Sequence, residues 1–208
     1  PAILEKWFAE RMEYQKLLKE SKAVGNTEKA EFYEKRQHVQ KILLNSVYGY
    51  LGLPTARFYD LDNAAAVTTS GQDVIKTTAK YINKLYMKKL NELNADADKD
   101  VDYVTYSDTD SIYASSAVFH PYLDIGKDDA SLKQFTIDWA TEVETAVNGF
   151  YDAMASNLFF CNKHRFFIKG ESVARSAFWL EKKRYAYHKI YDLDKKKDVD
   201  SITVKGLD

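Results

Sequence analysis

The chain has 208 residues, 45% of them hydrophobic, which is enough to bury one or two compact cores. Its 30 basic and 31 acidic residues give a formal charge of −1, which excludes a global positive field, so any nucleic-acid binding must use local basic patches. The single cysteine, Cys161, excludes an internal disulfide, and no apolar run approaches the ~20 residues that a membrane-spanning helix needs.

The first two predicted elements are helices. Apolar residues recur at helical spacing over residues 3–22 and again over residues 28–48, with Thr27 available as the N-cap of the second helix. The glycines and the proline of residues 49–54 are expected to end that helix. The short connection between the two predicts an antiparallel helical hairpin.

A third, long helix, capped by Asp62 or Asn63, is predicted to run to about residue 93. Beyond it the composition changes. Residues 101–106 and 111–114 are rich in β-branched and aromatic side chains and are separated by a tight polar segment. This pattern predicts a β-hairpin.

The rest of the chain combines a helix with strands. The predicted elements are a helix at about 131–157 and strands at 165–168, 178–180, 185–191 and 202–204. The order of elements predicts an α+β fold with an antiparallel β-sheet flanked by helices.

The turn of the predicted hairpin carries two carboxylates, Asp108 and Asp110, on either side of Thr109. At a hairpin tip they can converge on a hard divalent cation, since oxygen ligands with positions left open for substrate phosphates suit Mg²⁺. An ordinary polar turn is the alternative, because Asp, Ser and Thr favour turns through local hydrogen bonds.

A second chemical pattern lies on the second predicted helix. Lys41, Asn45 and Tyr48 fall at i, i+4 and i+7, so that a cation, an amide and an aromatic ring share one stripe. The stripe could hold a nucleotide, with Lys41 against phosphate and Tyr48 against a base or sugar. The alternative is a surface lysine beside a half-buried tyrosine.

Together the two patterns resemble a known family. Lys41-x-x-x-Asn45-Ser-x-Tyr48-Gly, followed about sixty residues later by Tyr106-x-Asp108-Thr-Asp110-Ser, resembles motifs B and C of family B DNA polymerases. Segments 58–64, 68–72 and 178–186 are similar to the replicative polymerases of T-even-like bacteriophages within that family. The resemblance covers the whole chain.

This resemblance implies a helical fingers hairpin, residues 1–50, packed on a palm, residues 51–208, that contains the antiparallel β-sheet. It also implies roles for four residues that would bind the incoming deoxynucleoside triphosphate. Lys41, Asn45 and Arg11 would reach its phosphates, and Tyr48 would monitor the nascent base pair.

The resemblance further implies a metal site and a DNA contact. Asp110 would bind two Mg²⁺ ions, with Mn²⁺ as an alternative ion, and Asp108 and Thr109 would complete the metal site. Asp108 and Asp110 would be the catalytic residues. Glu171 would support the metal ligands from a distance. The residues that resemble the family's contact with primer-template DNA are Lys182, Lys183, Arg184 and Tyr185.

Three departures from the family pattern stand out. Ser107 occupies a position that is usually glycine, which is expected to strain the turn slightly. A second fingers cation is expected one turn after Arg11, where the chain has Gln15 followed by Lys16. Lys169 replaces an acidic residue two positions before the expected carboxylate Glu171.

The family's motif A, which supplies another metal-binding aspartate, is absent from the sequence. The chain alone is therefore expected to be inert until the missing polymerase segments join it in cis or in trans. Since it begins at Pro1 without an initiator methionine, both ends are expected to be cut. A sliding clamp would attach through regions outside the chain. The expected location is the cytoplasm, of an infected bacterial host if the protein is viral, with no membrane partner.

Two other functions remain open on the residues alone. One is a non-catalytic DNA-binding half of a split polymerase. The other is a nucleotide-sugar glycosyltransferase, in which an Asp-x-Asp turn also binds a metal diphosphate, although the N-terminal helices do not suit that fold.

Overall fold

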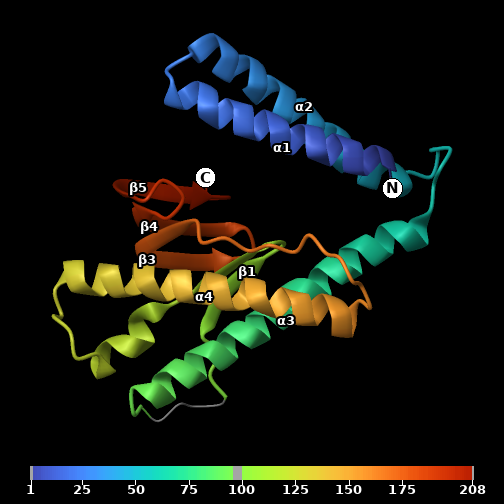
Figure 1. Ribbon diagram of the computed structural model, residues 1–208. Helices are drawn as coiled ribbons and strands as arrows, with labels where there is room; N and C mark the ends of the chain where they lie inside the picture. Colours follow the sequence, from blue (N-terminus) through green and yellow to red (C-terminus); the bar gives the residue numbers. More distant parts are fainter. Residues whose placement is uncertain (1, 96–99, 208) are drawn as a thin grey trace. The chain divides into compact units, whose positions relative to one another are not determined.

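The computed structural model describes residues 2–95 and 100–207, which form two compact units that meet between Ser70 and Gly71. In chain order the elements are α1 (Ala2–Ala23), α2 (Thr27–Leu51), α3 (Leu61–Glu92), β1 (Val104–Asp108), β2 (Ser111–Ala114), the 3₁₀ helix η1 (Ser116–Tyr122), α4 (Asp129–Leu158), β3 (Ser172–Glu181), β4 (Arg184–Asp192) and β5 (Lys197–Lys205) (Figure 1). The predicted α+β class is confirmed, with two small antiparallel sheets in place of one. Among the described helices, none has the length and apolar character needed to cross a membrane.

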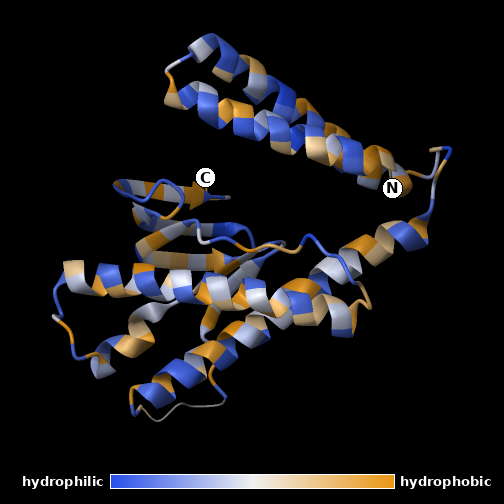
Figure 2. Cartoon of the chain, viewed as in Figure 1, coloured by the Kyte–Doolittle hydropathy of each residue, from blue (hydrophilic) through white to orange (hydrophobic). Residues whose placement is uncertain are grey.

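The first unit contains the predicted helical hairpin of α1 and α2. The Tyr14 and Tyr33 rings stack between the helices with centroids 6.4 Å apart, and Gln40 Nε2 donates to Glu10 Oε2 at 2.5 Å. Polar and apolar residues are mixed along both helices (Figure 2). Helix–helix packing here buries few side chains completely, so the hairpin relies on its local backbone hydrogen bonds and on partly exposed contacts.

The cap of α2 is Asn26, and the prediction of Thr27 was wrong by one residue. Gly25 ends the α1 side of the turn at φ 70°, and Asn26 follows in an extended conformation. Its side-chain oxygen accepts the backbone N–H of Lys29 at 3.0 Å, which satisfies one of the unpaired donors at the helix start. Thr27 is the first helical residue.

The boundary between α2 and α3 also differs from the prediction. Gly49 does not break α2, which continues to a C-cap at Gly52. Asp60, rather than Asp62 or Asn63, caps α3, because its carboxylate accepts the backbone N–H of Asn63 at 3.0 Å. A glycine in a helix costs free energy without ending the helix, which explains the first error.

The core of the second unit lies between α3, α4 and η1. Its buried members include Ile82, Tyr86, Leu90, Tyr103, Phe119, Trp139, Val147, Tyr151 and Met154. Phe119 comes from η1, and its ring lies 5.0 Å from that of Tyr86 and 5.1 Å from that of Trp139. The sequence did not predict η1, since seven residues are too few to show a helical period.

Both sheets are antiparallel, and their order along the chain is simple. The hairpin of β1 and β2 pairs Asp108 with Ser111, and the second sheet has the order β3-β4-β5. Trp179 of β3 pairs with Tyr185 of β4. The predicted hairpin is confirmed, although β1 begins at Val104 and residues 101–103 are not part of it. The predicted strands at 178–180, 185–191 and 202–204 lie within the longer strands β3, β4 and β5.

Residues 165–168, by contrast, do not form the predicted strand. Ile168 donates its N–H to Asn148 Oδ1 at 3.0 Å and accepts from Asn148 Nδ2 at 2.9 Å. The side chain of Asn148, on α4, thus replaces the neighbouring strand as hydrogen-bond partner.

Candidate metal-binding hairpin and basic turn

The hairpin between β1 and β2 closes through only two residues, Thr109 and Asp110. Thr109 has φ 55°, a conformation that β-branched residues rarely adopt, and the N–H of Asp110 donates to the carbonyl of Asp108 at 2.6 Å. Thr109 Oγ1 donates to Asp108 Oδ1 at 3.1 Å, and Ser111 Oγ donates to the Asp108 carbonyl at 3.1 Å. Local hydrogen bonds therefore hold a strained turn and orient one of its carboxylates.

The strain does not lie at Ser107, where it was expected. Ser107 sits inside β1, paired with Ile112, in ordinary strand conformation. The residue with the unusual backbone is Thr109, two positions later. The serine is thus compatible with the hairpin.

The donor set of the turn fits a partly open Mg²⁺ site. Asp110 is exposed and Asp108 is half-buried, so two carboxylates at one hairpin tip can reach an ion from solvent. Within residues 2–95 and 100–207, no cluster of three or more His, Cys, Asp or Glu side chains is placed to hold a metal. Mg²⁺ in phosphoryl-transfer sites is bound by one or two carboxylates together with substrate phosphates, and two carboxylates meet that minimum.

Behind the turn lies an aromatic cluster, defined here as Tyr106, Tyr113, Trp179, Tyr185 and Tyr187. Tyr106 stacks on Trp179 with centroids 4.8 Å apart and planes at 15°. The hydroxyls of Tyr113 and Tyr185 lie 3.2 Å apart. Burial, followed by that hydroxyl contact, raises the pKa of Tyr113 well above the ordinary tyrosine value. The cluster joins the hairpin to the β3-β4-β5 sheet.

Sequence reasoning did not predict this cluster, although a signal exists. Tyr106 and Asp108 are two residues apart on β1 and so share one face, and Tyr185 and Tyr187 share one face of β4. Alternating aromatic residues on two strands suggest a common apolar interface. The partner strand, however, lies more than seventy residues away in the chain, as the separation of 77 between Tyr106 and Lys183 shows.

The predicted DNA-binding residues occupy the turn between β3 and β4. Lys182 and Lys183 are its two exposed loop residues, and Lys183 has φ 65°. The backbone N–H of Lys183 donates to the hydroxyl of Tyr106 at 2.8 Å. Arg184 Nε donates to the Gly206 carbonyl at 3.2 Å, while Tyr185 belongs to the aromatic cluster. The basic turn is thereby hydrogen-bonded to β1, the strand that leads into the two-carboxylate turn.

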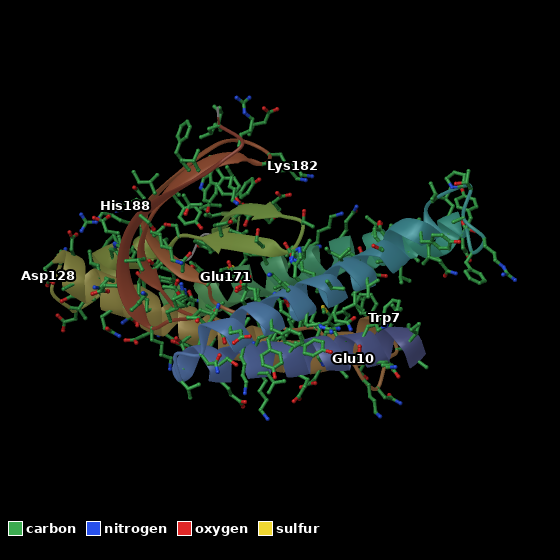
Figure 3. The ribbon with its side chains drawn as sticks, turned by 90° about the horizontal axis from the view of Figure 1, so that it is seen from above. Trp7, Glu10, Asp128, Glu171, Lys182 and His188 are labelled. Carbon is green, nitrogen blue, oxygen red and sulfur yellow. The ribbon has the colours of Figure 1, made fainter. Side chains whose placement is uncertain are left out.

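Glu171 is placed differently. It is exposed, and Figure 3 shows Glu171 and Lys182 at opposite ends of β3. Its carbonyl accepts the N–H of Leu193 at 3.1 Å. The carboxylate that is hydrogen-bonded nearby is that of Glu144, which accepts the N–H of Gly170 at 2.7 Å and was not predicted.

The predicted nucleotide-binding residues lie in the first unit. Lys41, Asn45 and Tyr48 are exposed on α2, at the helical spacing inferred from the sequence. The hydroxyl of Tyr48 lies 2.8 Å from that of Thr68 on α3, a contact that restrains the ring. Arg11, on α1, is half-buried, and its Nε has no hydrogen-bond partner among the described residues.

The two candidates for a second cation on α1 are distinguished by their exposure. Lys16 is exposed, whereas Gln15 is half-buried. A charged terminus at Lys16 is therefore accessible to an anion, although it does not follow Arg11 by one helical turn.

The sequence matches a known protein family over its whole length. The model of the family described as "DNA polymerase family B" matches residues 1–208. The DNA-directed DNA polymerase of Enterobacteria phage T4 is 32% identical over 168 residues, which cover 76% of this chain and 18% of the relative. That of Escherichia phage RB69 is 32% identical over 167 residues, covering 74% and 18% respectively.

An archaeal relative is matched over the full chain. The DNA polymerase of Thermococcus gorgonarius is 26% identical over 208 residues, which cover 100% of this chain and 21% of the relative. The chain thus spans about a fifth of the length of these curated relatives. Because the family model matches every residue, the chain belongs to DNA polymerase family B.

Proposed function

We propose that this chain provides the fingers and part of the palm of a template-directed DNA polymerase, with residues 1–50 as fingers and 51–208 as palm. One observation carries the proposal. The backbone N–H of Lys183, in the basic turn, donates to the hydroxyl of Tyr106, on the strand that leads into the turn with Asp108 and Asp110. One turn suits a metal-bound triphosphate and the other suits a DNA phosphate, as nucleotidyl transfer requires.

The metal would be held by Asp110 and Asp108. When bound, Mg²⁺, or Mn²⁺ in its place, neutralises phosphate charge and stabilises the attacking and leaving oxygens of an in-line displacement. The contribution of the chain is to keep the carboxylates in place. The Thr109 hydroxyl fixes Asp108, and the exposed Asp110 stays open to substrate.

The incoming deoxynucleoside triphosphate would bind along α2. Lys41 would pair with its phosphates and Asn45 would donate a hydrogen bond, with Arg11 as a further cation. The ring of Tyr48, restrained by Thr68, would lie against the nascent base pair. The primer 3′-oxygen then attacks the α-phosphorus, and pyrophosphate leaves.

Primer-template DNA would lie on the basic turn. Lys182 and Lys183 would contact its phosphates, which gives binding that tolerates any sequence. Arg184 and Tyr185 would set the position of that turn from within the sheet, since both are hydrogen-bonded to other strands or their ends. Glu171, at the far end of β3, would act on the metal site only indirectly.

Two carboxylates without a third acidic ligand among the described residues favour a second candidate, a DNA-binding half that needs further segments for catalysis. Those segments would join in cis or in trans, and a sliding clamp would bind outside this chain. The cytoplasm is the proposed location. Membership of DNA polymerase family B leaves no observation in favour of a glycosyltransferase.

Primer extension with Asp110→Asn tests the catalytic half of the proposal. In the polypeptide that carries this chain, the substitution should lower extension by at least about a hundredfold, since it removes a metal-binding charge. Asp124→Asn, at an exposed position between η1 and α4, is the matched control and should extend normally. Equal extension by the two variants would refute the assignment. Extension by the unaided 208-residue chain would show that no further carboxylate is needed.

DNA binding tests the other half. Replacing Lys182 and Lys183 by alanine should reduce the slope of log affinity against log salt by about two, one for each phosphate that is no longer neutralised. Lys195 and Lys196 offer a matched control, because they lie in the other turn of the same sheet and Lys196 also has positive φ, 48°. Fluorescence anisotropy with a labelled duplex measures both, and equal slopes for the two double variants would exclude a specific role for the basic turn.

A further inference from the structure

Tyr106 makes two contacts with the end of the β3-β4-β5 sheet, one through its ring and one through its hydroxyl. The ring stacks on Trp179, 4.8 Å between centroids. The hydroxyl accepts the backbone N–H of Lys183 at 2.8 Å, a distance typical of a well-formed hydrogen bond. Asp108 follows Tyr106 by two residues on the same strand, so this side chain joins the basic turn to the strand that leads into the two-carboxylate turn.

Both turns contain a non-glycine residue in a left-handed conformation. Thr109 has φ 55° and Lys183 has φ 65°. Such residues are held there only when their surroundings determine the conformation, and they concentrate at functional sites. At Lys183 the surroundings include the Tyr106 hydroxyl, which binds the N–H of the strained residue itself.

The opposite side of the basic turn is held by Gly206, just after β5. A side chain at that position could not fit, since a Cβ would lie 2.4 Å from the Lys183 carbonyl oxygen. Arg184 Nε also donates to the Gly206 carbonyl at 3.2 Å. The amide of Lys183 is thus fixed by the hairpin and its carbonyl is confined by the chain after β5, so the turn has little freedom to shift alone.

We propose that Tyr106 is a positioning residue that couples the basic turn to the two-carboxylate turn. When a duplex binds the basic turn and displaces it, the hydrogen bond from the Lys183 amide to the Tyr106 hydroxyl moves β1 with it. The positions of Asp108 and Asp110 then change as well. This coupling rests on the proposed function for its ligands, but the contact itself does not.

Tyr113 provides a matched control for the positioning role of Tyr106. It belongs to the same aromatic cluster, and its hydroxyl also makes one contact between the hairpin and the sheet, 3.2 Å from Tyr185 Oη. That contact joins strand β2 to strand β4, however, and does not touch the loop residues Lys182 and Lys183. Loss of either hydroxyl leaves an aromatic ring in place, so Tyr106→Phe and Tyr113→Phe are matched in size and setting.

The first measurement needs no ligand. In the ¹⁵N-labelled 208-residue chain, Tyr106→Phe should speed hydrogen exchange of the Lys183 amide by about fivefold, the effect of one typical hydrogen bond. Tyr113→Phe should leave the Lys183 amide unchanged. Equal exchange of that amide in the two variants and in the original chain would overturn the contact on which the proposal stands.

The second measurement tests the coupling. Addition of a primer-template duplex to the original chain should shift the amide resonances of both Lys183 and Asp110. In Tyr106→Phe the shift at Lys183 should remain, while that at Asp110 falls to less than about half, because the hydroxyl no longer transmits the change. In Tyr113→Phe both shifts should persist.

The two measurements separate the positioning role of Tyr106 from the proposed DNA contact. If Tyr106→Phe keeps the full Asp110 shift, or if Tyr113→Phe loses as much, Tyr106 has no special positioning role. If the original chain shows no shift with DNA at either turn, the proposed DNA contact fails, and the exchange measurement still decides whether Tyr106 holds the basic turn.

Discussion

Tyr86 should make the stability of the second unit fall at alkaline pH. Its side chain is 3% exposed and stacks on Tyr103 with centroids 5.5 Å apart. Burial raises the pKa of Tyr86 from 10.0 to about 12. The unfolded chain therefore loses this proton at a lower pH than the folded chain, so the stabilisation is complete below pH 10 and is lost as pH rises from 10 toward 12.

The size of the effect follows from the pKa difference. At about pH 12 the unfolded state gains roughly 2 kcal/mol relative to the folded state through Tyr86 alone. Tyr86→Phe keeps the ring and removes the titrating group, so its unfolding free energy should not show this fall at high pH. Tyr113 and Tyr151, whose pKa values are also raised mainly by burial, contribute equally in both proteins.

Urea unfolding at about pH 9 and about pH 12 measures the difference. Tryptophan fluorescence can report the second unit alone if Trp7 is replaced by Phe in both proteins, which leaves Trp139 and Trp179. Between the two pH values, the unfolding free energy of the original chain should fall by about 2 kcal/mol more than that of Tyr86→Phe. A difference that stays constant with pH would show that Tyr86 titrates as it does in the unfolded chain, and the reasoning from burial would fail.

Three further predictions concern residues whose contacts are equally specific. Phe119→Ala should lower the unfolding free energy by about 3–5 kcal/mol, because it empties a fully buried ring site, and Phe119→Leu should cost less; denaturant unfolding compares them. Asp60→Ala removes the cap of α3 and should lower the unfolding free energy by about 1 kcal/mol, seen as a lower thermal midpoint. Asp62→Ala, within the first turn of α3, should lower it little. Lys183→Gly should raise the unfolding free energy by about 1 kcal/mol, since glycine tolerates φ 65°, whereas Lys183→Ala should not; an unchanged or lower value for the glycine variant would argue against strain in this turn.

The sequence predicted those elements whose signal is local. The helices of residues 2–51 and the hairpin around Asp108 have clear periodicity or composition, and the structure confirms them. The errors fall where two local signals compete or where a distant side chain decides. Asn26 and Thr27 are both good caps, and only the backbone shows which one is extended. Residues 165–168 have strand-like composition, but the backbone of Ile168 is hydrogen-bonded to the Asn148 side chain and the N–H of Phe166 donates to His164.

The candidate site was predictable as a set of motifs but not as an arrangement. Spacing alone placed Lys41 and Tyr48 on one helix and the two aspartates in one turn. It could not show that Tyr106 reaches Lys183, because nothing local in either segment specifies its partner. Nor did it indicate that the strain would lie at Thr109 rather than Ser107, which depends on where the two-residue turn falls in the register.

The contact between Tyr106 and Lys183 also sets an order of assembly during synthesis. The α1–α2 hairpin can form from neighbouring residues as soon as it leaves the ribosome, since contacts close in sequence form fast. The contact of the Tyr106 hydroxyl must wait for Lys183, which is translated 77 residues later. At ordinary translation rates this is a delay of roughly 4 to 15 s, during which the faces of Tyr106 and Tyr113 that later meet Trp179 have no partner. The docking of the hairpin on the β3-β4 turn is therefore among the last steps in the folding of the chain. A nascent chain stalled before Trp179 would display an aromatic surface open to chaperones or to aggregation.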